Sequence, residues 1–166
     1  MHPTAMKNAH SFASKYLITN EILSVLDIGG ANVNGTLRDV FVPKGHTYTS
    51  LDIREAEGVD IVANPQEGYP IQDNTFNVVV STSMMEHDQA FWITFNEMVR
   101  VVKPNGYIYL CVPSRGNHHW DRDCWRFLED AYPALEKWNK EVVLVEHYID
   151  PQGHWGDNIG IFQKCK

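Results

Sequence analysis

Five short apolar runs are spread along the chain, and polar or helix-like segments separate them. This alternation limits the fold more than any other feature, because strands joined by such crossovers form a parallel sheet that is covered on both faces. Two further strand-like segments close the chain with no helix between them, and they predict a hairpin at one edge of the sheet. The pattern therefore predicts an α/β sheet that is parallel except for one antiparallel strand. The runs and the two closing segments comprise residues 25–28, 47–51, 59–62, 76–80, 107–112, 141–149 and 157–164.

The clearest helix lies between the fourth and fifth apolar runs, in residues 89–102. Its apolar side chains recur at helical spacing, whereas Asn96, Glu97 and Arg100 lie off that face. The sequence KPNG at 103–106 predicts a turn that ends this helix. The apolar positions of the helix are Phe91, Phe95, Met98, Val99 and Val102.

The chain has 166 residues, a length suited to one core, and we expect a single domain over residues 1–166. The formal net charge of -7 argues against nucleic acid as a partner, because binding to phosphates needs clustered lysine and arginine. No apolar stretch is long enough to span a membrane, and the N-terminus lacks the apolar core of a signal peptide. We therefore expect a cytoplasmic protein without a membrane partner, whose three cysteines, lacking any CxxC pair, are reduced thiols.

Gly29 and Gly30 directly follow the first apolar run and precede a segment of expected helix. Glycine lets a ligand approach the backbone closely, so their N–H groups are expected to face a carboxylate or a phosphate at a helix N-terminus. A tight turn without a ligand is the alternative. Asp52 ends the next strand, where such folds place a carboxylate on the two ribose hydroxyls, and its alternative is a helix cap or a solvated acid. Together these features predict a nucleoside-bearing cofactor.

Asp27 distinguishes between such cofactors. It stands two residues before the first glycine, where its charge would repel the pyrophosphate of a dinucleotide. A zwitterionic or cationic ligand suits this position better. S-adenosylmethionine, with an amino-acid tail, a sulfonium and an adenosine, meets that requirement, and a nicotinamide-dependent reductase is the less favoured alternative.

Three stretches of the chain resemble class I S-adenosylmethionine-dependent methyltransferases, and within them a group of small type 11-like enzymes of undefined acceptor. The middle stretch is the most specific, because it combines a strand, MEH, an aromatic helix, KPNG and a strand in that order. The resemblance implies a three-layer Rossmann-like methyltransferase fold, with a mostly parallel seven-stranded sheet and a C-terminal antiparallel hairpin strand. The stretches are VLDIGGANVNGTLR at 25–38, FNVVVSTSMMEHDQAFWITFNEMVRVVKPNGYIYLCVPS at 76–114 and HHWDRDCWRF at 118–127.

The resemblance also implies a cofactor site. Asp52 would hold the ribose hydroxyls, and Ile53 would pack on the adenine, with ordinary core packing as the alternative for Ile53. Asn64 and Pro65 stand where the family has an acid and a small residue at the adenine edge; Asn64 retains a hydrogen-bonding group, whereas Pro65 has no N–H. The other implied cofactor contacts are Asp27, Gly29, Gly30 and Ala31 at the methionine end, and Ser81 and Ser83 near the sulfonium.

Catalytic residues are expected in two segments. His87, in the MEH motif, is the first candidate for a base because an imidazole titrates near neutral pH, although this position in the family often only orients structure and cofactor. Residues 113–127 follow the fifth strand and supply the second candidate, His119. A metal site made of His118, His119 and Cys124 lacks a fourth ligand, so no metal is expected.

The same segment predicts the acceptor side. Its mixture of charged and flat aromatic side chains suits a sugar ring or a small polar aromatic compound. The alternative is structural: Trp125, Phe127 and Leu128 would anchor the following helix in the core, while Arg126 pairs with a nearby acid.

The sequence thus predicts a methyltransferase that uses S-adenosylmethionine, releases S-adenosylhomocysteine and methylates a small-molecule acceptor such as a sugar or a small polar metabolite. In-line displacement mainly requires placement of the reacting atoms, and a base is needed only for a hydroxyl or a protonated amine. The alternative is a non-catalytic module that binds S-adenosylmethionine or S-adenosylhomocysteine and partners a biosynthetic enzyme. The short chain, Pro65, and Asn77 in place of a family aspartate motivate that alternative.

Overall fold

The computed structural model describes residues 2–166, and seven of its strands form one sheet in the order β3-β2-β1-β4-β5-β7-β6. β7 runs antiparallel to both of its neighbours, β5 and β6, whereas the remaining pairs are parallel. The predicted Rossmann-like sheet with one antiparallel strand from a C-terminal hairpin is therefore confirmed. The strands are β1 (Ser24–Ile28), β2 (Thr47–Asp52), β3 (Ile61–Val62), β4 (Phe76–Thr82), β5 (Val102–Pro113), β6 (Val142–Ile149) and β7 (Asp157–Lys164).

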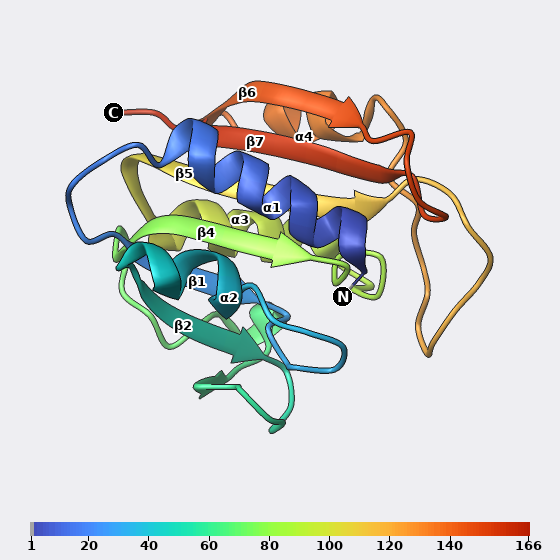
Figure 1. The fold of residues 1–166 in the computed structure, drawn as a ribbon, viewed down its shortest axis with the longest axis horizontal. Helices are drawn as coiled ribbons and strands as arrows, with labels where there is room; N and C mark the ends of the chain where they lie inside the picture. The colour runs from blue at the N-terminus through green and yellow to red at the C-terminus, as the bar shows by residue number, and fades with distance from the viewer. Residues whose placement is uncertain (1) are drawn as a thin grey trace.

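Helices cover both faces of the sheet (Figure 1), and each face has its own apolar core. α1 and α2 pack on one face, and α3 and α4 pack on the other. Successive strand residues alternate between the cores: Leu26 and Ile28 join the α3 side, whereas Val25 joins the α1 side. The helices are α1 (Pro3–Tyr16), α2 (Arg38–Phe41), α3 (Phe91–Val101) and α4 (Ala131–Trp138), with 3-10 turns η1 (Val42–Lys44) and η2 (Pro65–Glu67). Within residues 2–166, no helix is both long and apolar enough to cross a membrane.

α1 is the element that the sequence pattern missed. Its buried face is built largely from alanines, which give little contrast in hydropathy, together with Phe12, whose ring stacks on Tyr109 of β5 at 4.8 Å between centroids. Just before α1, His2 bonds Asp157 through Nε2 at 2.7 Å, and the Thr4 hydroxyl donates to the same carboxylate at 2.7 Å. These contacts hold the start of α1 beside the carboxyl ends of the parallel strands (Figure 1).

The boundaries of three predicted segments differ from the observed ones. The predicted helix 89–102 forms as α3, and the predicted third strand 59–62 is reduced to β3. The KPNG segment does follow the end of α3, but it forms the first part of β5 instead of a separate turn. In this part the pairing register between β5 and β4 shifts, between Phe76 and Val78 of β4. Asn105, at φ 62°, lies within this irregular part of β5.

Candidate active site

A cavity of about 1130 Å³ opens at the carboxyl ends of the parallel strands. Ligands of open α/β sheets collect at this edge, because the loops that follow the strands converge there. Each of the first five strands contributes lining residues from its end or its following loop, and His2 and Pro3 at the start of α1 add two more. The expected site residues that line it are Gly29, Ala31, Asp52, Ile53, Asn64, Pro65, Ser83, His87 and His119.

Asp52 and Ile53 lie side by side at the end of β2. The Asp52 carboxylate accepts weak hydrogen bonds from the N–H groups of Ala31, at 3.4 Å, and Arg54, at 3.3 Å. Ile53 is 58% exposed although it is apolar, and it lines the cavity. Ordinary core packing is therefore excluded for Ile53, which presents an apolar surface next to a carboxylate.

Asn64 and Pro65 form the start of η2 in the cavity wall. The side-chain oxygen of Asn64 caps this turn by accepting from the Gln66 N–H at 3.1 Å. Pro65 occupies the first position of the turn, where an N–H has no intrahelical partner to lose. The departure from the family pattern at Pro65 thus has a local structural reason.

The prediction that the N–H groups of Gly29 and Gly30 face a ligand is wrong. Both N–H groups donate to the carbonyl of Leu51, at 2.8 and 3.1 Å, so they continue the β1–β2 pairing instead of facing a ligand. No helix starts at the pair either, since α2 begins only at Arg38. The glycines are needed for packing: a Cβ on Gly29 would lie 2.3 Å from Met84 Cγ, and one on Gly30 would lie 2.3 Å from Ser50 Oγ.

Asp27, Gly30 and Ser81 do not line the cavity, and their direct contacts with the cofactor stay predictions. Asp27 accepts a hydrogen bond from the Tyr48 hydroxyl on the α2 side of the sheet. Burial raises the pKa of Asp27 to about 7, against the lowering effect of that hydrogen bond. The Ser81 hydroxyl donates to the Ile28 carbonyl at 2.8 Å, so both side chains support the wall from behind.

The turn after β4 begins at Ser83 and carries a residue that sequence reasoning missed. Ser83 has φ 52°, and its N–H donates to the Cys111 carbonyl at 2.9 Å, which directs the chain into the cavity edge. Glu86 follows, and its buried carboxylate lines the cavity without a hydrogen-bond partner for either oxygen among the described residues. Burial raises the pKa of Glu86 to about 8. The sequence signal that could have identified Glu86 as a site residue is an acid beside a histidine, directly after a buried strand.

His87 and His119 are brought together from different loops. Their ring centroids lie 5.0 Å apart, and His87 Nε2 lies 3.7 Å from Glu86 Oε1. Burial lowers the pKa of His87, so its imidazole is neutral near pH 7. The two expected catalytic residues therefore share one end of the cavity with Glu86.

Asp123 fixes the orientation of His119. Its Oδ2 atom accepts from the His119 N–H at 2.8 Å and lies 3.1 Å from His119 Nδ1. Arg126 binds both Asp123 oxygens and holds the pKa of that carboxyl well below its usual range. The Trp155 ring packs against His119 at 4.3 Å between centroids.

The loop that carries His119 is tied to the turn after β4, because the N–H groups of Cys124 and Trp125 donate to the Glu86 carbonyl. The structural alternative is confirmed for Phe127, which is buried, and for the predicted pairing of Arg126 with an acid. The same alternative is wrong for Leu128, which is 66% exposed, and Trp125 is not buried in the core either: it is 37% exposed and donates its indole N–H to the Asp88 carbonyl. The Cys124 thiol faces the Arg122 carbonyl, so it does not join a metal set with His118 and His119.

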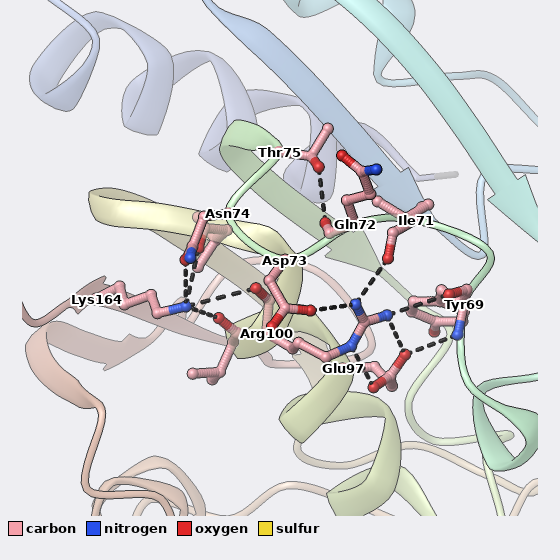
Figure 2. Close-up of polar contacts among 11 residues, drawn as sticks. Tyr69, Ile71, Gln72, Asp73, Asn74, Thr75, Glu97, Arg100 and Lys164 are labelled. Carbon is pink, nitrogen blue, oxygen red and sulfur yellow. Dashed lines mark hydrogen bonds and ion pairs between the residues drawn. The ribbon is translucent and has the colours of Figure 1, made fainter.

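Tyr69 completes the wall, and a polar network at the end of α3 holds it there (Figure 2). The Arg100 guanidinium bonds Glu97 at 2.7 Å and Asp73 at 2.8 Å, and it also donates to the Tyr69 carbonyl at 3.2 Å. Glu97 in turn accepts from the Tyr69 N–H at 2.7 Å. This network fixes residues 69–73 against α3.

The fold and the cavity at its carboxyl edge are those of class I methyltransferases. A family model described as a methyltransferase domain matches residues 3–152, so the chain belongs to this family. The expected class I S-adenosylmethionine-dependent methyltransferase is thereby confirmed. No curated protein matches the sequence significantly.

Solved structures of low sequence identity share the fold. The 1,6-didemethyltoxoflavin-N1-methyltransferase of Burkholderia thailandensis, solved with 1,6-didemethyltoxoflavin and S-adenosylhomocysteine, is 17% identical with a TM-score of 0.78, covering 98% of this chain and 79% of that chain. Phosphoethanolamine N-methyltransferase 2 of Haemonchus contortus, solved with phosphomonomethylethanolamine and S-adenosylhomocysteine, is 13% identical with a TM-score of 0.69, covering 96% and 52%. The [4+2]-cyclase SpnF is 11% identical with a TM-score of 0.70, covering 96% and 81%. The fold alone therefore does not define the reaction.

Proposed function

We propose that this protein transfers the methyl group of S-adenosylmethionine to a small polar acceptor, a sugar or a similar metabolite, bound beside His87 and His119. One observation carries the proposal: a single cavity of about 1130 Å³ is lined both by Asp52 with Ile53 and by the two histidines. Pockets for one drug-sized ligand occupy about 300–1,000 Å³, so this volume accommodates a cofactor together with a small acceptor.

The cofactor half of the proposal assigns three binding roles. The Asp52 carboxylate accepts from the ribose hydroxyls, and the exposed Ile53 side chain packs on the adenine. Asn64 bonds the adenine edge through its side-chain amide, while Ala31 and Ser83 border the methionine and sulfonium end. S-adenosylmethionine, when bound, supplies a methyl carbon already activated by a sulfonium leaving group.

The acceptor half assigns the polar contacts to His87 and His119. A neutral His87 accepts a proton from an acceptor hydroxyl or ammonium, and the lowered pKa of His87 keeps it in that form. His119, oriented by Asp123, positions the acceptor. The two methyltransferases solved with small acceptors support this acceptor class, and the net charge of -7 supports the absence of nucleic acid.

Two of the features that motivated the non-catalytic alternative have local structural explanations, whereas the third, the short chain, still motivates it. Pro65 fits the first position of η2, and Asn77 accepts from both the N–H and the hydroxyl of Ser24, at 3.0 and 2.8 Å, which ties β1 to β4. Both departures thus have local structural roles. The single domain over residues 1–166 and the cytoplasmic location stay predictions.

The cofactor assignment is tested by calorimetric titration with S-adenosylhomocysteine. Removing a charged hydrogen-bond partner costs about 1.5–3 kcal/mol, so Asp52→Ala should weaken binding by about 10-fold to 150-fold. Glu55→Ala is the matched control, because it removes an exposed acid near the same strand end without lining the cavity. Equal affinity of the Asp52→Ala variant and the wild type would refute the assignment.

Catalysis is tested by incubating the protein with a metabolite extract and S-adenosylmethionine labelled in the methyl group. The wild type should label a small compound, and Asp52→Ala should label it far more slowly at low cofactor concentration. A wild type that binds S-adenosylhomocysteine but labels no compound would favour the non-catalytic module.

A further inference from the structure

Three potential metal ligands converge at the acceptor end of the cavity. One ligand atom from each of Glu86, His87 and His119 lies within 4.8 Å of the other two, and this is the one such group among residues 2–166. Atoms spaced in this way surround a point that small side-chain shifts bring to about 2.0–2.2 Å from all three, the distance of zinc ligands.

Glu86 is the buried acid of the cluster. Its side chain is 1% exposed, and neither carboxylate oxygen has a hydrogen-bond partner among the described residues. A buried carboxylate without a partner is costly, because the interior solvates the charge poorly. The adjacent His87 does not supply a partner, because its Nε2 atom lies 3.7 Å from Glu86 Oε1, beyond hydrogen-bonding distance. A cation bound there would supply the partner that the ionised form of Glu86 needs.

The surroundings of His119 resemble the support that metal-binding histidines receive. Asp123 lies 3.1 Å from Nδ1, which directs the other ring nitrogen away from the Asp123–Arg126 pair. Metal-ligating histidines usually donate their second ring N–H to such a carboxylate. Trp155 packs on the ring and restricts its rotation.

We propose that Glu86, His87 and His119 bind one divalent transition-metal ion of the zinc class. Two imidazoles and one carboxylate form a donor set typical of zinc and of non-haem iron(II), and three protein ligands leave at least one position open. All three residues line the cavity, so an open position faces the acceptor. The catalytic use of the ion rests on the proposed function: the ion would bind an acceptor oxygen and lower the pKa of the acceptor hydroxyl, which would replace proton removal by His87. Ion binding itself does not rest on the proposed function.

Tag-free protein, stripped with a chelator and dialysed, provides the test. Calorimetry with Zn²⁺ should give one tight site per chain, and Co²⁺ should give visible absorption bands of a protein-bound ion. Glu86→Gln and His119→Ala should each weaken binding by at least about tenfold. His118→Ala and Cys124→Ser are matched controls, because they remove neighbouring donors outside the cluster and should leave affinity unchanged.

Two outcomes overturn the proposal. One is Zn²⁺ affinity in the wild type no higher than in a Glu86→Gln/His87→Ala/His119→Ala variant. The other is loss of binding in His118→Ala or Cys124→Ser with retention in His119→Ala. Circular dichroism verifies folding, and His119→Ala, which changes only a loop, keeps the test valid if Glu86→Gln fails to fold. Titration with S-adenosylhomocysteine separates this result from the proposed function, because either ligand can fail to bind while the other binds.

Discussion

Gly29→Ala is the substitution that best tests how the first turn is built. Gly29 has φ +79°, a conformation that residues with a Cβ rarely adopt, and an added Cβ would lie 2.3 Å from Met84 Cγ and 2.6 Å from Met84 Cβ. Met84 Cβ is fixed by its own backbone, so rotation of the Met84 side chain removes only the first of the two clashes. The turn after β1 and the turn after β4 must then move apart.

The expected loss of stability has two parts. A left-handed backbone costs a residue with a Cβ about 1–2 kcal/mol, and forcing extra volume into a packed contact costs about 1–3 kcal/mol. Gly29→Ala should therefore lower the free energy of unfolding by about 2–5 kcal/mol. This is a large fraction of the roughly 5–15 kcal/mol that holds an ordinary domain folded.

Urea titrations in the absence of ligand measure this loss. Gly45→Ala is the matched control, because Gly45 has φ +87° but no atom within 4 Å of the added Cβ, so it should lose only the backbone part. In a double-mutant cycle, Met84→Gly should recover most of the packing part for Gly29→Ala, whereas Met84→Ala should recover less, since its Cβ remains.

Equal losses for Gly29→Ala and Gly45→Ala would refute the reasoning, because the contact with Met84 would then contribute nothing. Additive effects of Gly29→Ala and Met84→Gly would refute it independently. In either case, the requirement for glycine at position 29 would come from the backbone angle alone.

Two further predictions concern the wall of the cavity. Burial raises the pKa of Asp27 to about 7, above its value near 3.9 in the unfolded chain. The protonated carboxyl therefore stabilises the fold fully below about pH 4. This contribution to the free energy of unfolding falls by up to about 4 kcal/mol as pH rises through 7. Urea titrations should show that the free energy of unfolding falls less between pH 5 and pH 8 in Asp27→Asn than in the wild type. Equal falls in the two proteins would contradict this cause. Arg100→Leu should lower the free energy of unfolding by about 1.5–3 kcal/mol and weaken S-adenosylhomocysteine binding, because Arg100 holds the segment that carries Tyr69. Lys140→Leu, which removes an exposed cation, should change neither quantity in the same unfolding and calorimetric assays.

Local patterns were enough to predict most of the elements. Two such patterns are the apolar strand runs that alternate with helical segments and the 3.6-residue period of α3. Each depends only on neighbours in the chain. The sequence pattern did not predict α1, because its buried alanines give little contrast in hydropathy with its exposed residues. The buried face of this helix is recognisable only from its packing on β5. The boundaries of β3 and β5 depend on pairing partners, and local sequence does not specify these.

The candidate site divides in the same way. Asp52, Ile53 and His87 lie directly after strands, so their place at the carboxyl edge of the sheet followed from the strand prediction. The sequence also suggested ligand contacts for the N–H groups of Gly29 and Gly30, which the structure assigns to the Leu51 carbonyl. Hydrogen-bond direction depends on the neighbouring strand.

The sequence by itself determined the parallel sheet with its closing hairpin, the family and the edge where ligands bind, because each follows from short-range periodicity and local motifs. Only the tertiary structure decided that Glu86 is buried without a partner and that His119 joins it and His87. Those features require two loops from different strands to meet, and the order of strands in the sheet, rather than any spacing along the chain, sets which loops meet.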